Sequence, residues 1–244
     1  SINFFSTFVD FLLVFLLANI LGANEFGRYI FIISLIKFFG LPILVGYPYF
    51  ILRKSSYITS NNLKKNNNLL WRNIFIILIY IIFLFLSILF FRYLNQDFLN
   101  DKYNIFLFGV ISVIPALSLN NTISAVIRTS KSEVKGQLLE KLIPNIIFIG
   151  LILIFYWAFK FENHTIYLFL FGFSSILSLI FSLTQIKNIF SWTNLETKNL
   201  INNIISDIRD SILLVIFQIF VLLNNLLPII ILGFFESSEI VGNY

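Results

Sequence analysis

Residues 73–91 read NIFIILIYIIFLFLSILFF, a run of 19 residues that contains no charge. At 1.5 Å per residue, an α-helix of this length spans about 28 Å, close to the roughly 30 Å hydrocarbon layer of a bilayer. The run lacks the polar face that a helix on the surface of a soluble protein requires. It therefore predicts a transmembrane helix.

The same pattern recurs along the whole chain. Of the 244 residues, 58% are hydrophobic and 12% are charged, about half the charged fraction typical of soluble proteins. This recurrence argues against buried helices of a large soluble protein. Apolar runs between polar breaks predict seven membrane-spanning helices, at about 3–21, 29–52, 70–91, 105–127, 142–159, 165–186 and 210–232. The expected fold class is all-α, a polytopic transmembrane helical bundle.

Lysine and arginine gather in alternate connections between the predicted spans. The second, fourth and sixth connections hold twelve of the 17 basic residues, and the opposite connections hold four. By the positive-inside rule, the basic connections face the cytoplasm and the N-terminus lies inside. The formal net charge of +5 follows from this topology, so we expect no nucleic-acid partner.

Several kinds of chemistry are missing from the sequence. The chain has no cysteine, and its one histidine, His164, falls in a short outer loop, where we interpret it as an ordinary surface residue. A histidine-based triad or metal cluster is thereby excluded. No G-x-x-x-x-G-K-[ST] motif is present, and Asp207 and Asp210, at the predicted cytoplasmic start of a helix, are explained by capping and the helix dipole. We expect no enzyme, no cofactor and no bound metal.

Two ionisable residues lie inside predicted spans, where a charge costs several kcal/mol unless it faces a cavity or a partner. Asp10 shares one helical face of the first span with Asn3, Ser6 and Thr7, and Lys37 lies in the second span. Counted from the outer turn, Asp10 is about 16 Å and Lys37 about 12 Å deep, so antiparallel neighbours would bring them together. They form either an ion pair that only fixes packing or a cavity-facing cation and carboxylate.

Side-chain amides mark two further spans. Asn120 and Asn121 lie in the fourth, and Gln218 and Asn225 lie two turns apart in the seventh. An amide in lipid needs a partner, so all four are expected to face inward. Interhelical hydrogen bonds and a path for a polar substrate account for them equally well.

The second span contains two prolines, Pro42 and Pro48, together with Gly40 and Gly46. Proline removes a backbone donor and clashes with the preceding turn of a helix. The span is therefore expected to be kinked or broken, which the membrane tolerates only beside protein or a water-filled cavity.

The two ends of the chain resemble each other. The segment 20–29, ILGANEFGRY, and the segment 231–244, ILGFFESSEIVGNY, both read as a helix end, a short acidic turn and a Gly-x-Tyr that opens the next helix. Offsets of 211 and 215 residues match a unit of six spans, which makes the repeat parallel. We predict a six-helix N-terminal lobe at 1–209 and the first helix of a second lobe at 210–244. Because the chain opens at Ser1 without a methionine, it is expected to be a fragment.

These residues resemble the polysaccharide-biosynthesis flippases of the multidrug/oligosaccharidyl-lipid/polysaccharide exporter superfamily. The segment 21–29, LGANEFGRY, is similar to the first outer turn of that family, and Leu232-Gly233 with 241–244, VGNY, is similar to the start of its second lobe. Gly46-Tyr47-Pro48 with Arg53 resembles the end of its second span. The connection between its fourth and fifth spans is matched by Arg128, Gln137, Glu140 and Pro144.

The resemblance implies two six-helix lobes, twelve to fourteen spans in all, around a central cavity. It further implies alternating access that flips a polyprenyl-diphosphate-linked oligosaccharide from the cytoplasmic to the outer leaflet of a bacterial inner membrane, for surface polysaccharides such as O-antigen. The expected partners are this lipid-linked oligosaccharide, membrane lipid and other polysaccharide assembly proteins.

Within this resemblance, Lys37 is the first candidate for the diphosphate and Arg53, at the cytoplasmic mouth, the second, although Arg53 equally serves the positive-inside rule. Asp10 is the candidate for ion coupling. The remaining candidate substrate-binding residues are Asn120, Asn121, Gln218 and Asn225. The alternatives are an ion-coupled multidrug exporter, a permease subunit of an ATP-driven complex, or a membrane-embedded glycosyltransferase or polymerase.

Overall fold

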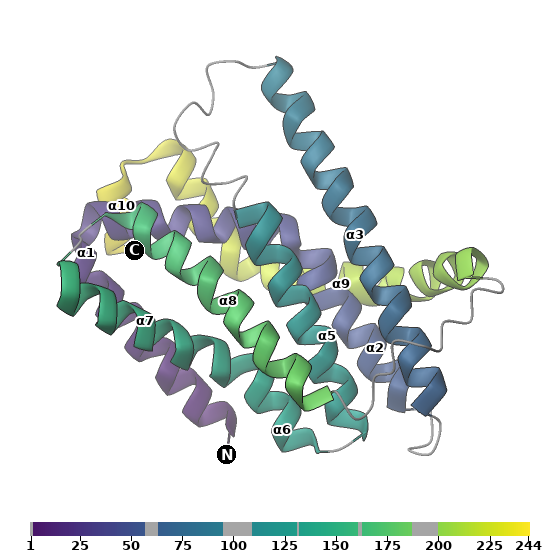
Figure 1. The fold of residues 1–244 in the computed structure, drawn as a ribbon. Helices are drawn as coiled ribbons and strands as arrows, with labels where there is room; N and C mark the ends of the chain where they lie inside the picture. The colour runs from purple at the N-terminus through teal and green to yellow at the C-terminus, as the bar shows by residue number, and fades with distance from the viewer. Residues whose placement is uncertain (1, 57–62, 95–108, 131, 161–162, 187–199) are drawn as a thin grey trace.

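The computed structural model describes residues 2–56, 63–94, 109–130, 132–160, 163–186 and 200–244, almost all of them helical (Figure 1). Within these ranges, six helical segments are long and apolar enough to cross a membrane: Ile2–Ser55, Asn68–Phe90, Gly109–Thr129, Glu133–Phe159, His164–Ile186 and Asn203–Phe235. The bundle surface is rich in large apolar side chains; Phe83 is 62% exposed and Trp157 is 89% exposed. Such a surface suits lipid and not water, which confirms an all-α, multi-pass membrane protein.

The first of these segments contains two of the predicted spans. It comprises α1 (Ile2–Leu41), η1 (Pro42–Gly46) and α2 (Tyr47–Ser56), and its 54 membrane-compatible residues would measure about 80 Å if straight. It is not straight, because Gly22 has φ 69° and ψ 167°, a conformation that glycine tolerates without strain. Figure 1 shows the chain turning back at this end of α1. We call residues 2–21 leg A and residues 23–41 leg B; six segments thus accommodate the seven predicted crossings.

Three π-helical turns occur in the described part of the chain, and each ends two residues before a proline. They are η1, η2 (Gly109–Val113) and η3 (Leu138–Leu142), and they precede Pro48, Pro115 and Pro144. In η1 the N–H of Tyr47 donates to the carbonyl of Pro42, five residues back. A π-turn bypasses the hydrogen bond that proline cannot make. Of the two outcomes expected for the second span, a kink or a break, the structure excludes the break: the helix continues through a π-turn, a feature at which helices kink.

The remaining helices follow the predicted order with shifted ends. They are α3 (Leu63–Leu94), α5 (Ile114–Ser130), α6 (Glu133–Gln137), α7 (Ile143–Phe159), α8 (His164–Ile186), α9 (Leu200–Phe235) and α10 (Ser238–Asn243). The span predicted at 165–186 is confirmed within one residue. The span predicted at 210–232 belongs to a helix that starts ten residues earlier, so the predicted lobe boundary at 209/210 lies inside α9. Residues 105–108 of the predicted fourth span lie outside the described residues.

The bundle has two ends of different composition. The turn at Gly22, the start of α8 at His164 and α10 lie together at one end, which we call the glycine end (Figure 1). Lys54, Arg72 and Arg128 lie at the opposite end, which we call the basic end. Each end has its own apolar core, with Leu17, Phe148 and Tyr167 in one, and Ile51, Leu69 and Val126 in the other. The segregation of charge matches the one-sided distribution predicted for the connections.

Candidate substrate site

A set of exposed polar side chains lies where the two legs of α1 meet α7. We call it the polar face and define it by Asn3, Thr7, Asp10, Lys37, Lys141 and Asn145, of which Asn145 is half-buried and the rest exposed. Exposed phenylalanines (Phe4, Phe8, Phe11 and Phe15) occupy a neighbouring side of leg A, about 110° around the helix. Leg A therefore has one side suited to lipid and one suited to a cavity or a polar partner.

Two hydrogen bonds connect leg A to α7 and to η3. The amide of Asn145 donates to a carboxylate oxygen of Asp10, and the ammonium of Lys141 donates to Oδ1 of Asn3 at 3.2 Å. Asn3 precedes Asp10 by two turns, and their partners follow in the same chain order, with Lys141 one turn before Asn145. The amide of Asn145 is a partner of Asp10 that the sequence pattern did not reveal.

Lys37 approaches this arrangement from leg B. Its charge and that of Lys141 lie near enough to Asp10 to interact with it electrostatically. Asp10 and Lys37, both in described segments, are nevertheless not joined by a direct ion pair, because Asp10 is bonded to Asn145 instead. The structure thus brings the two predicted residues together without the contact expected of a packing-only pair. The polar face carries two ammonium groups and one carboxylate.

Asn120 and Asn121 lie in contacts between helices. Asn120 is completely buried, donates to the carbonyl of Leu139 at 3.0 Å and accepts from the hydroxyl of Ser182. Both ends of its amide are occupied, which favours the helix-packing alternative over a substrate path.

Asn121 compensates for a proline. In an α-helix the carbonyl of Leu44 would accept from the N–H of residue 48, but Pro48 has none. The side-chain amide of Asn121 donates to that carbonyl at 2.8 Å. The hydroxyl of Tyr80 donates to another carbonyl of this span, that of Phe39, at 2.7 Å. Asn121 therefore closes a gap in the backbone hydrogen bonding of the second span.

The remaining candidates lie apart from the polar face. Gln218 is half-buried and Asn225 is exposed on α9, and within the described part of the chain neither bonds to a member of the polar face. Arg53 is exposed in the last turn of α2 at the basic end. The structure does not place these three with Lys37.

A buried ion cluster at the basic end was not anticipated. Asp207 of α9 is 0% exposed, forms an ion pair with Lys54 of α2, and lies with Oδ2 3.2 Å from Nε of Arg72 of α3. This corrects the interpretation of Asp207 as a residue at the start of a helix, because α9 begins two turns before it. The one sequence feature that could have indicated this cluster is the presence of an acidic residue, Asp207, in a connection rich in basic residues. A second ion pair joins Arg128 of α5 to Glu140 of η3.

His164 is the second correction, since it is a contact residue and not an ordinary surface residue. Its side chain is 14% exposed, and its Nδ1 lies 2.6 Å from Oε2 of Glu25, which also pairs with Arg28 at 3.1 Å. The backbone N–H of His164 donates to the same carboxylate oxygen at 3.2 Å. Glu25 thus joins the start of leg B to the start of α8.

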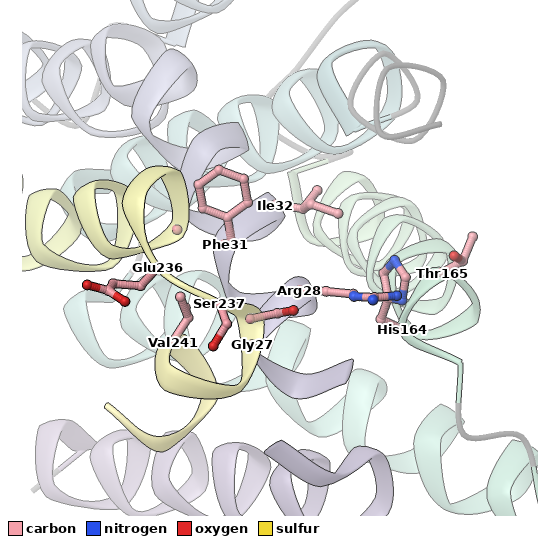
Figure 2. Close-up of a pocket in the computed structure, with 11 residues that line it drawn as sticks. Gly27, Arg28, Phe31, Ile32, His164, Thr165, Glu236, Ser237 and Val241 are labelled. Carbon is pink, nitrogen blue, oxygen red and sulfur yellow. The ribbon is translucent and has the colours of Figure 1, made fainter. Parts of the chain in front are cut away.

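A pocket of about 550 Å³ opens beside this cluster, at the glycine end (Figure 2). Gly27, Arg28 and Phe31 of leg B line one side, and His164 and Thr165 of α8 line a second. The third side comes from the α9–α10 junction, Gly233, Glu236, Ser237, Ser238 and Val241. Across the described ranges, no three histidine, aspartate or glutamate side chains are grouped to hold a metal ion.

A family model described as polysaccharide biosynthesis protein matches residues 1–244, the whole chain. No curated protein and no solved structure gives a match.

Proposed function

Because the chain belongs to the polysaccharide biosynthesis protein family, we propose that it is a membrane transporter that flips a polyprenyl-diphosphate-linked oligosaccharide. The cargo moves by alternating access from the cytoplasmic to the outer leaflet of a bacterial inner membrane, with the basic end of the bundle and the N-terminus on the cytoplasmic side. The observation that carries the proposal is the polar face, since it presents Lys37 inside the otherwise apolar leg B together with Lys141 of η3.

The chemistry of the polar face suits a diphosphate sugar. A diphosphate in a low-dielectric environment needs cations, and Lys37 has no direct protein partner among the described residues, which leaves its three donors available. Lys141 supplies a second ammonium group once it leaves Asn3. Asn3 and Thr7 offer hydrogen-bonding groups for sugar hydroxyls.

Asp10 is the proposed site of ion coupling. Its carboxylate lowers the positive charge of the polar face while no substrate is bound, and it is held there by the amide of Asn145. Binding of a proton or a cation at Asp10 would strengthen the attraction of Lys37 and Lys141 for an anion. The occupancy of Asp10 and that of the diphosphate site are therefore expected to be positively linked.

The charge balance favours this function over the alternatives. An exporter of cationic drugs needs an acidic binding surface, whereas the polar face has one carboxylate against two ammonium groups. A glycosyltransferase or polymerase needs a reactive acidic or metal centre facing its sugar substrates. We propose that the chain moves its substrate without covalent chemistry and is not an enzyme.

The test is genetic. Deletion of the gene is expected to leave lipid-linked oligosaccharide on the cytoplasmic face of the membrane and to deplete surface polysaccharide, and the parental gene should restore both. Gene copies that encode Lys37→Ala should restore neither, although the protein accumulates in the membrane. Normal surface polysaccharide in the deletion strain would contradict the proposal.

A further inference from the structure

The pocket at the glycine end carries polar side chains that the polar face does not use. Arg28 and Thr165 lie on one side of this pocket, and Glu236 and Ser237 lie on another (Figure 2). Its volume of about 550 Å³ is that of a pocket for a small organic ligand or a short chain of sugars. The pocket lies where α8 begins and α9 ends, and both helices are long enough to cross a membrane. It is therefore at the level where the spans meet water.

Hydrogen-bonding capacity remains at these four side chains. Arg28 uses one guanidinium nitrogen, Nη1, in its ion pair with Glu25 at 3.1 Å. Among the residues that the structure describes, none bonds to the Glu236 carboxylate or to the hydroxyls of Thr165 and Ser237. A guanidinium only donates, a carboxylate only accepts, and a hydroxyl does both. The pocket thus offers donors at one side, acceptors at another, and hydroxyls at both.

This arrangement favours a polyhydroxyl ligand over a simple ion. An anion attracted by Arg28 is repelled by the carboxylate of Glu236, and a cation meets the same two groups with the signs reversed. A sugar satisfies both, because each of its hydroxyls donates one hydrogen bond and accepts others. Hydrogen bonds to an ionised side chain are also the stronger ones. Ile32 and Val241 line the pocket as well and supply apolar contact for the C–H face of a sugar ring.

The pocket is separate from the polar face, although leg B contributes to both. Arg28 precedes Lys37 by nine residues, which is about 14 Å along the helix and about two and a half turns. The two side chains therefore leave leg B in nearly opposite directions. A diphosphate at Lys37 and a ligand in the pocket lie on different sides of this helix, so the pocket is a second site.

We infer that the pocket at the glycine end binds the glycan part of a lipid-linked oligosaccharide once it has reached the outer side of the membrane. The class of ligand, a chain of sugar hydroxyls, follows from the pocket, whereas its lipid-linked origin and its side of the membrane rest on the proposed function. Arg28 and Glu236 bind hydroxyls at the two sides of the pocket, and Thr165 and Ser237 add a hydrogen bond on each side.

The site is tested with a glycan that lacks both lipid and diphosphate. Mild acid releases the free oligosaccharide from the lipid-linked intermediates of the cells that make the protein. Its binding to the purified full-length protein in nanodiscs is titrated by saturation-transfer NMR. We expect saturable binding that Glu236→Ala weakens by about tenfold or more, and Thr165→Ala on the other side should weaken it by a smaller factor. Glu236 has no partner among the described residues, so its replacement removes no contact between them.

Two control variants and a competitor accompany the titration. Glu239→Ala removes the same charge three residues later, at an exposed side chain outside the pocket, and should leave the affinity unchanged. Lys37→Gln, in the polar face, should also bind the free oligosaccharide as the parent does. Inorganic diphosphate should not displace the oligosaccharide.

The possible results separate the pocket from the proposed function. No binding by the parent, or equal affinity in Glu236→Ala, would overturn the glycan site, as would loss of binding in Lys37→Gln or displacement by inorganic diphosphate. Flipping of the lipid-linked form by a protein that binds no free glycan would leave the proposed function standing. Glycan binding by a protein that does not flip would contradict the proposed function and leave the glycan site.

Discussion

The side-chain amide of Asn145 on α7 donates a hydrogen bond to the carboxylate of Asp10 on leg A. This contact joins segments 135 residues apart in the sequence and holds the carboxylate beside two lysines. The exposed charges of the polar face depend on it, because an ionised carboxylate in a membrane needs a compensating donor.

Replacement of Asn145 is predicted to impair transport more than folding. Asn145→Ala removes a hydrogen bond to a charged group, a loss of about 1.5–3 kcal/mol, and leaves Asp10 free to pair directly with Lys37 or Lys141. Substrate affinity should fall by about tenfold or more. Binding of a radiolabelled polyprenyl-diphosphate sugar measures the effect. Ser87→Ala is the control, since that hydroxyl donates to the carbonyl of Phe83 in its own helix; equal losses in both variants would contradict a role for Asn145.

The buried cluster at the basic end is predicted to determine stability. Asp207→Asn leaves Lys54 and Arg72 without their shared carboxylate and should destabilise the fold by about 3–5 kcal/mol. Asp210→Asn, one turn later at a side chain that is 49% exposed, should change stability by less than about 0.5 kcal/mol. Thermal unfolding in detergent micelles compares the two. Similar midpoints would show that the cluster does not hold α9 in place.

The role of Asn121 is predicted to depend on Pro48. Asn121→Ala strands the carbonyl of Leu44 and should destabilise the protein by about 1–3 kcal/mol. Pro48→Ala returns a backbone N–H that the same carbonyl accepts in an α-helix. In that background Asn121→Ala should have a much smaller effect, which a double-mutant cycle of unfolding free energies measures. Additive effects would contradict the compensation.

The close approach of leg B to α10 predicts matched sensitivity at one glycine of each. Gly27→Ala and Gly242→Ala each place a methyl group less than 2 Å from an opposing carbonyl oxygen, that of Ser238 and that of Ala23, so both should lower the thermal unfolding midpoint in detergent micelles. Gly150→Ala on α7 is the control, because a Cβ there meets no atom within 4 Å. An unchanged midpoint in either glycine variant would contradict the close approach.

The helices were predictable from the sequence because lipid demands long uncharged runs, and α8 matches its predicted span within one residue. The partners of polar residues were not predictable, because they depend on packing between distant segments. Asp207 meets Lys54 across 153 positions, and Asn121 meets Leu44 across 77. Hydrophobic periodicity assigns a residue to one side of its own helix. It does not identify the helix that this side contacts.

The candidate site likewise contains some residues that the sequence predicted and others that only the structure revealed. The cost of a charge in lipid marked Asp10 and Lys37 as residues that face a cavity or a partner, and they do lie close together. Lys141 was counted among the basic connections, since nothing in its neighbourhood shows that the turn of η3 brings it back to Asn3. Asn145 sits in an apolar helix, and only the contact with leg A reveals its role.

Flipping by the purified full-length protein in vesicles tests the central claim most directly. The parent should move a fluorescent polyprenyl-diphosphate sugar between leaflets, Lys37→Gln should slow this by about tenfold or more, and Lys160→Gln, an exposed lysine at the opposite end of α7, should not. Unchanged flipping in Lys37→Gln, or no flipping by the parent, would contradict the assignment of the polar face as the substrate site.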